Sequence, residues 1–220
     1  MKKFPILVAV LMVFGSTSLA FGQDNADAWR NVTLGPMFMP GASINAGSVA
    51  DGTKTGAQFS WCLGAVSIFP LSPNFGVQLA ACYDSRGVEF SDQSNSSNFI
   101  DYTLNYFSLR PEFTIGDFLI GLGLGIPVGS SATGGGIYSS FHDNIGASSM
   151  NFLLEGRLGA TIPVVTSQTG NTLRFIIEGS YAFSKITSNS VSGASDDSKN
   201  NGPIAGLQVG FAYLFNLNPK

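Results

Sequence analysis

The links between strand-like segments constrain the fold of this chain more than any other feature of the sequence. Eight segments alternate apolar residues with small or polar ones and are rich in β-branched and aromatic residues, a pattern typical of β-strands. We predict strands over 30–38, 56–69, 75–86, 99–113, 117–128, 150–163, 172–186 and 203–215. The short links are 70–74, 114–116 and 164–171, and the long links are 39–55, 87–98, 129–149 and 187–202.

Long and short links alternate without exception along the chain. A membrane β-barrel has short turns at its periplasmic rim and longer loops at its outer rim, whereas a soluble sandwich has no reason to sort its loops this way. An even number of strands with an inward N-terminus places every short link on the periplasmic side. The sequence therefore predicts an all-β fold, an eight-stranded antiparallel up-and-down transmembrane β-barrel.

The first residues have the features of an export signal. Lys2 and Lys3 precede an apolar run over 4–14, which is long enough for a signal peptide and too short for a spanning helix. Small residues at 18, 20 and 22 fit signal-peptidase cleavage between Ala20 and Gln23. We therefore expect a signal peptide over 1–22 and one barrel domain over 23–220, exported to the bacterial outer membrane.

Composition excludes several classes of protein. Charged residues make up 11% of the chain and the formal net charge is −3, whereas a soluble domain averages roughly 25% charged residues. A disordered chain would be charge-rich and poor in aromatics, and a nucleic-acid binder needs a basic surface. The chain also has too few charges to cover the surface of an ordinary cytosolic enzyme, so we expect no nucleic-acid partner.

The polar face of the predicted strands carries few of the charged residues typical of a solvent-exposed face. In segment 172–186, Phe175, Ile177 and Tyr181 share one face, and Arg174 and Glu178 share the other. The polar faces carry mostly Gly, Ser, Ala and Gln, while lysine is absent from the strand interiors. Small residues suit the crowded interior of an eight-stranded barrel. We therefore expect the apolar face to meet lipid.

Six charged residues fall on the predicted inner faces. Three are basic and three acidic, so they can neutralise each other in a confined lumen, and removing one partner of a buried pair costs roughly 3–5 kcal/mol. Two interpretations stay open: a structural charge network that fills the lumen, or an ion path with a gate. These residues are Arg110, Glu112, Glu155, Arg157, Arg174 and Glu178.

In segment 99–113 the apolar residues do not stay on one face of the predicted strand. Tyr102, Leu104 and Tyr106 share a face, whereas the apolar set beyond them begins at Phe107. We predict a β-bulge near Tyr106-Phe107, which adds one residue and shifts the phase. The alternative is that Tyr106 simply points into the lumen.

Aromatic residues gather near both predicted rims, as they do at the two interfaces of a bilayer. Beside the short turns and the final strand end lie Phe69, Phe75, Phe113, Phe118, Phe175 and Phe215. Toward the long loops lie Trp61, Tyr83, Tyr102, Phe152 and Phe183.

The remaining candidate sites are few. Cys62 and Cys82 each lie ten residues from Ser72, so antiparallel pairing about Ser72 would place them opposite each other on the inward face, as a candidate disulfide or as two buried thiols. His142, the one histidine, lies among loop serines. A histidine with serine and a carboxylate could serve lipid chemistry, but no catalytic, nucleotide-binding or metal motif accompanies it. We predict no catalytic, cofactor or metal site.

Two short stretches resemble a known group of proteins. The residues Leu109-Arg110-Pro111-Glu112-Phe113, a short turn and then 117–123, together with the turn over 69–75, are similar to hairpins of small porin-family outer-membrane β-barrels of Bacteroidetes-type bacteria. The resemblance implies an integral outer-membrane barrel, usually without an assigned activity.

Three functions are compatible with the sequence. The first is an outer-membrane barrel with a structural, adhesion or narrow-pore role, whose partners are membrane lipid and, during biogenesis, the barrel-assembly machinery. The second is an outer-membrane lipid-modifying enzyme, which rests on His142 alone. The third is a soluble periplasmic barrel with an apolar ligand inside, which requires Phe175 and Phe211 to point inward and Arg174 and Gln208 to point into water.

Overall fold

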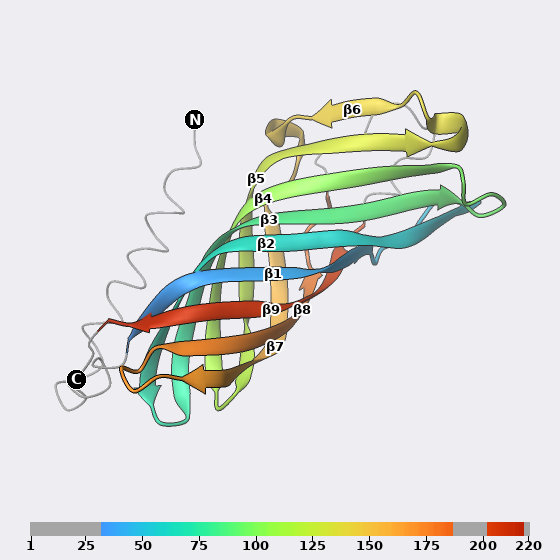
Figure 1. Ribbon diagram of the computed structural model, residues 1–220. Helices are drawn as coiled ribbons and strands as arrows, with labels where there is room; N and C mark the ends of the chain where they lie inside the picture. The colour runs from blue at the N-terminus through green and yellow to red at the C-terminus, as the bar shows by residue number, and fades with distance from the viewer. Residues whose placement is uncertain (1–31, 187–201, 218–220) are drawn as a thin grey trace.

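The computed structural model describes residues 32–186 and 202–217 (Figure 1). The predicted signal peptide over 1–22 lies outside these ranges. Nine antiparallel strands form one sheet, and eight of them close into a ring in the order β4-β3-β2-β1-β9-β8-β7-β5, sealed by pairing of β4 with β5. The strands are β1 (Thr33–Asn45), β2 (Thr53–Ser72), β3 (Phe75–Asp92), β4 (Phe99–Ile115), β5 (Phe118–Gly135), β6 (His142–Ile145), β7 (Leu153–Thr166), β8 (Thr172–Ala182) and β9 (Ile204–Asn216). The predicted eight-stranded up-and-down barrel is confirmed.

Tight turns join the strands at one rim of the barrel. Gly116 has a φ of +60° in the turn between β4 and β5, and Gly170 has a φ of +83° in the turn between β7 and β8. Glycine populates this left-handed region without the steric cost that a Cβ imposes. Thr33 of β1 pairs with Asn216 of β9 at the same rim. This short-turn rim is the periplasmic one in the usual layout of such barrels.

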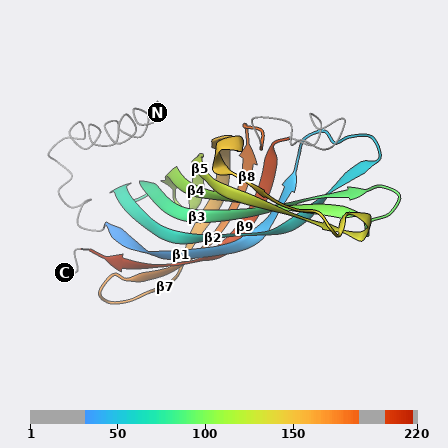
Figure 2. The same ribbon diagram turned by 90° about the horizontal axis from the view of Figure 1, so that it is seen from above.

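At the other rim, half of the barrel wall continues well past the rest. Strand β2 has 20 residues and β3 and β5 have 18 each, whereas about 9–11 tilted residues cross a bilayer. Pairing of β5 with β7 ends at Gly125 and Leu153, while pairing of β4 with β5 continues to Phe99 and Gly135. The extra length forms a curved projection (Figures 1 and 2). We call it the outer sheet: 53–60, 87–92, 99–103, 128–135 and 142–145.

The short strand β6 covers an edge of β5 that would otherwise be unpaired. Where β7 ends, the edge of β5 would be left unpaired, and open sheet edges are prone to unwanted pairing. Strand β6 pairs with Ser130–Thr133 of β5, and four residues separate this stretch from Gly125, the last residue of β5 that pairs with β7. Two 3₁₀ turns flank it, η3 (Gly136–Tyr138) and η4 (Ala147–Ser149). We predicted neither β6 nor the outward extension, so the predicted long links were too long.

The predicted bulge in segment 99–113 is wrong. Leu104, Tyr106 and Arg110 all lie buried on one inward face of β4, so the phase of β4 does not change. The irregularity lies on the neighbouring strand: Asn105 pairs with Gly129 and Tyr106 with Pro127, which leaves Val128 of β5 as the extra residue. The alternative, with Tyr106 in the lumen, is correct, because the outer part of the lumen is apolar enough to receive the ring.

Candidate functional site

Seven charged side chains meet in the middle of the barrel interior. Each is at most 4% exposed as a residue, although isolated charges are expensive to remove from water. Four carboxylates face three guanidinium groups, so each charge has an opposite neighbour. We call this group the charge layer: Asp84, Arg86, Arg110, Glu112, Glu155, Arg157 and Glu178.

Arg86 joins the two sides of the lumen. Its Nη2 donates to Asp84 Oδ2 on its own strand at 2.8 Å, and its Nη1 donates to Glu155 Oε2 on β7 at 2.7 Å. A planar guanidinium that binds carboxylates through several N–H groups is held in one orientation. The arrangement therefore fixes β3 against β7 across the lumen.

Arg157 gathers three carboxylates. Its Nη1 donates to Glu155 at 2.6 Å, its Nε lies 3.3 Å from Glu112 Oε1, and its Nη2 donates to Glu178. Arg110 completes the layer: its Nη2 donates to Asp84 Oδ2 at 2.9 Å and to Gln208 Oε1 at 3.1 Å, and its Nη1 lies 3.5 Å from Glu178. The network thus spans β3, β4, β7, β8 and β9.

Inward glycines make room for the acidic side chains. Glu112, Glu155 and Glu178 each pair with a glycine of the neighbouring strand. A Cβ on Gly121 would approach Glu112 Cγ at 2.7 Å, and one on Gly159 would approach Glu178 Cγ at 2.9 Å. The glycine row is therefore a packing requirement of the charge layer rather than part of a ligand-binding loop.

Apolar side chains close the lumen on both sides of the charge layer. An inner cluster toward the short turns contains Met37, Met39, Val66, Leu119 and Leu214, each buried. An outer cluster toward the long links has ten buried members: Val88, Phe90, Leu104, Tyr106, Ile145, Met150, Leu153, Ala182, Ile186 and Ile204. An eight-stranded barrel has an interior that side chains can fill. Charged and apolar layers together fill this one.

The structure brings five of the six charged residues proposed from sequence into the charge layer. Arg174 lies apart near the short-turn rim, where its Nε donates to Thr161 Oγ1 at 2.9 Å and its Nη2 lies 3.9 Å from Asp117 Oδ1. Its side chain is 19% exposed. It shares the inward phase of β8 but sits too far toward the rim to reach the other charges.

Sequence reasoning left Asp84, Arg86 and Gln208 out of the charge network, although it placed Gln208 on the inward face of its strand. The available signal was the phase of β3, because Gln78, Ala80 and Cys82 continue at every second residue into Asp84 and Arg86. All are buried. Extending the inward face to the end of the predicted strand would have added both charges to the network.

The two cysteines are free and buried thiols. They do not lie opposite each other as expected, because Cys62 pairs with Asp84 and Cys82 pairs with Gly64. A two-residue turn over Pro73–Asn74 and a register shift between Pro70 and Ser72 displace the centre of the hairpin from Ser72. The thiols are thus diagonal neighbours on one inward face, a geometry in which Cα atoms are commonly too far apart for a disulfide.

His142 begins β6 and is exposed, paired with Thr133 of β5. Within 32–186 and 202–217, no cluster of three or more His, Cys, Asp or Glu side chains has the arrangement of a metal site. No helix among the described residues has the length and apolar character needed to cross a membrane.

Two acidic residues lie side by side on the outer sheet. Glu89 and Asp101 are cross-strand partners, and Gln58 Nε2 donates to both, at 2.8 Å to Glu89 Oε2 and 3.1 Å to Asp101 Oδ1. Partial burial and then the Glu89 carboxylate raise the pKa of Asp101. The shared Gln58 amide holds the two like charges together.

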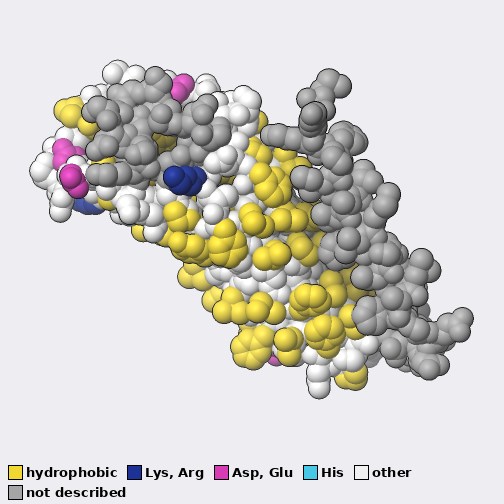
Figure 3. Space-filling view, turned by 180° about the vertical axis from the view of Figure 1, so that it is seen from behind, with side chains coloured by type: hydrophobic (Ala, Val, Ile, Leu, Met, Phe, Trp, Pro, Cys, Tyr) yellow, Lys and Arg dark blue, Asp and Glu magenta, His cyan; other side chains and the backbone are white. Residues whose placement is uncertain are grey.

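The exterior of the barrel is apolar. Phe118 is 70% exposed and Leu158 64%, while Gln208 on the opposite face of β9 is 5% exposed. Figure 3 shows a broad band of apolar side chains over the barrel part of one side. A soluble barrel with an apolar ligand requires the reverse facing, which this surface contradicts.

Aromatic residues border this band at both ends, largely as predicted. Near the short turns, Phe75 stacks on Phe113 with ring centroids 5.7 Å apart. Toward the long links, Trp61 and Tyr83 lie 5.5 Å apart. Tyr102 is an exception, because its ring points inward and packs edge-on against Phe90.

No protein-family model and no curated protein sequence matches the chain. Among solved structures, Ail, the attachment invasion locus protein of Yersinia pestis, solved with the heparin analogue sucrose octasulfate, is 16% identical with a TM-score of 0.41. That alignment covers 84% of this chain and 98% of Ail. The outer membrane protein OprG from Pseudomonas aeruginosa is 16% identical with a TM-score of 0.32, over 84% of this chain and 94% of OprG.

A closed ring leaves no open sheet edge within the bilayer, which a membrane-spanning β structure requires. The ring of eight strands, the apolar band and its aromatic borders meet that requirement together. The described part of the chain is a transmembrane β-barrel of the outer-membrane type.

Proposed function

We propose that the chain is an integral outer-membrane protein whose barrel is a closed, non-conducting anchor, and that its outer sheet serves adhesion or another surface interaction without catalytic chemistry. The filled lumen carries this proposal. The charge layer and the two apolar clusters occupy the interior from rim to rim, which favours a structural role for the network over an ion path.

The shape of the molecule supports the surface role. Strands β2–β5 extend far beyond what a bilayer requires, and β6 caps the exposed edge of β5. A barrel that served only as a stable plug would have no need for this extension. Membrane lipid and, during insertion, the barrel-assembly machinery are the partners that such a protein requires.

Planar-bilayer recording tests the anchor. The mature protein, verified as folded by its heat-dependent shift on a gel, should give no stable unitary conductance steps, while a large porin recorded in the same bilayers should. Reproducible unitary steps from the folded protein would refute the closed lumen and favour the narrow-pore role.

Labelling of intact cells tests the surface role. Thr133 is exposed on the outer sheet, and Asn74 is exposed in a short turn at the opposite rim. A membrane-impermeant maleimide should therefore modify Thr133→Cys on intact cells and Asn74→Cys only after the outer membrane is broken. The reverse pattern would mean that the outer sheet faces the periplasm.

The lipid-modifying alternative depends on His142. This side chain lies at the exposed start of β6, and its sequence neighbours Ser140 and Asp143 are exposed as well. Unchanged lipid profiles in a strain with His142→Ala would be the expected result, and a lost lipid species would revive the enzyme.

A further inference from the structure

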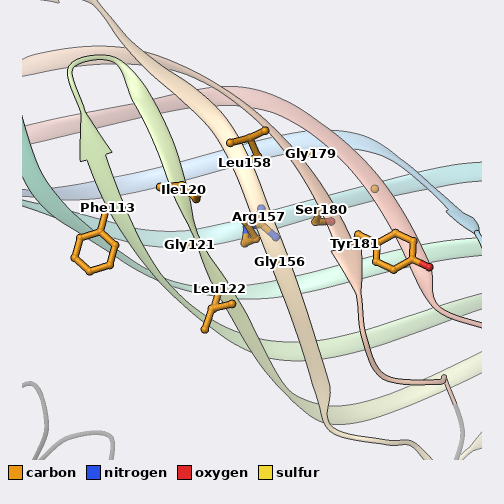
Figure 4. A pocket seen from close by; sticks show the side chains of 11 residues that line it. Phe113, Ile120, Gly121, Leu122, Gly156, Arg157, Leu158, Gly179, Ser180 and Tyr181 are labelled. Atoms are coloured by element: carbon orange, nitrogen blue, oxygen red, sulfur yellow. The ribbon is translucent and has the colours of Figure 1, made fainter.

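The apolar exterior contains a groove across β5, β7, β8 and β9. Its volume is about 860 Å³, and Ile120, Leu122, Leu158 and Tyr181 are among the side chains that line it (Figure 4). Because the groove opens from the apolar band, it is continuous with the surface that meets lipid. Its occupant in a bilayer must therefore be hydrocarbon.

Two glycines shape the groove. Leu158 pairs with Gly179, and Tyr181 pairs with Gly156. On each of β7 and β8, a large side chain therefore alternates with a glycine. Phe183 covers part of Gly156, since a Cβ there would lie 3.1 Å from its ring. At Gly179, an added Cβ would have no neighbour closer than 3.8 Å. The floor at Gly179 is therefore open.

A cation stands at the outer end of the same face. At alternate positions Gly179 is followed by Tyr181, Phe183 and Lys185, while Ala182 and Ile186, at inward positions, are buried in the outer cluster. Hydrogen bonds from Phe183 N to Leu154 O and from Asn151 Nδ2 to Lys185 O hold this stretch against β7. Lys185 is exposed and forms no ion pair with another residue of the described ranges.

The spacing fits half a bilayer. Lys185 lies six positions after Gly179, and the last three of them follow the end of β8 at Ala182. A fully extended stretch of that length spans at most roughly 20 Å. At the tilt of about 40° typical of barrel strands this is at most about 15 Å along the membrane normal, the depth of one leaflet's hydrocarbon. A lipid with its acyl chain over Gly179 would have its phosphate near Lys185.

We propose that this face binds one anionic lipid of the outer leaflet, with an acyl chain in the groove and the phosphate at Lys185. A second copy of the barrel fits less well, because a two-fold axis along the membrane normal would place two Lys185 ammonium groups at the same height in one interface. The proposal rests on the membrane-spanning role of the barrel.

Native mass spectrometry of the full mature protein in mild detergent tests the proposal, with phosphatidylglycerol and phosphatidylcholine added in equal amounts. The wild type should retain phosphatidylglycerol about fivefold over phosphatidylcholine, the preference that one basic residue near an anionic headgroup confers. Lys185→Gln, a change at an exposed position, should abolish the preference while phosphatidylcholine is still retained.

Filling the groove separates the acyl contact from the charge. Gly179→Leu should reduce retention of both lipids several-fold. Ala65→Leu places the same side chain at an exposed position on β2, across the barrel, and should behave as the wild type. Equal retention by Gly179→Leu and Ala65→Leu, or no headgroup preference in the wild type, would overturn the proposal. Failure of the wild type to fold or insert would count against the membrane role itself, so the two failures are distinguishable.

Discussion

Replacing Arg157 by methionine should lower the free energy of unfolding of the barrel far more than the same change at Arg174. Methionine keeps an unbranched apolar stem and removes the charged guanidinium group. Arg157 is fully enclosed and lies within hydrogen-bonding reach of Glu112, Glu155 and Glu178. Without it, two guanidinium groups would face the four carboxylates of the charge layer.

The magnitude follows from that burial. Removing one partner of a buried ion pair costs roughly 3–5 kcal/mol, because the remaining charge is left without compensation. We expect Arg157→Met to lower the free energy of unfolding by at least about 3 kcal/mol. Arg174 is partly exposed, and its one ion pair among the described residues is 3.9 Å long. Arg174→Met should therefore cost about 1 kcal/mol.

Urea unfolding of the refolded protein in micelles, followed by the heat-dependent gel shift and by circular dichroism, measures both losses. Adding Glu178→Gln to Arg157→Met should recover part of the loss, since it removes one of the uncompensated carboxylates. If the two arginine variants unfold alike, or if Glu178→Gln makes the double variant worse by its full single cost, the charges are not enclosed as described.

Two further predictions follow from other parts of the molecule. Cys62 and Cys82 are free and buried, so they should resist maleimide in the folded protein, react after unfolding and show the mass of the reduced form; a mass two hydrogens lower would contradict the register. Burial and Glu89 raise the pKa of Asp101, so folding favours its protonated form and the contribution of Asp101 to stability should increase as the pH falls through that pKa. Asp101→Asn should raise the melting temperature at neutral pH and weaken its rise toward acid pH; an unchanged pH dependence would contradict the assignment.

The barrel could be predicted from sequence because its determinants are local. Alternation at every second residue fixes the facing of β7, β8 and β9, and the lengths of the links fix which rim each belongs to. These patterns do not depend on which strands finally pair. The phase of β8, with Phe175 outward and Glu178 inward, is therefore as the sequence indicates.

The features that were missed depend on contacts between distant residues. Tyr106 points inward because the outer cluster, built from six different strands and the links beside them, offers an apolar space for its ring. The diagonal placement of Cys62 and Cys82 follows from a register shift beside the turn. Strand β6 pairs with β5 because β7 ends early, and the sequence of β6 alone does not indicate this pairing.

The members of the charge layer could be predicted only in part from the local sequence. The inward phase correctly marked Arg110 and Arg157, yet phase alone gives no height along the barrel. Arg174 shares that inward phase but stands near the rim. Asp84 and Arg86 lie on the inward face of β3 within the predicted strand over 75–86, but the prediction did not follow that face to its end.

Oxygen accessibility along β8 tests the central claim most directly. Single nitroxide labels would be placed at 173–181 in a protein whose two cysteines are replaced by alanine, reconstituted in vesicles. The account predicts high accessibility to oxygen dissolved in the bilayer at 173, 175, 177, 179 and 181, and low accessibility at the even positions, which line the filled lumen. A maximum at the even positions, or no alternation at all, would contradict the facing on which every other inference depends.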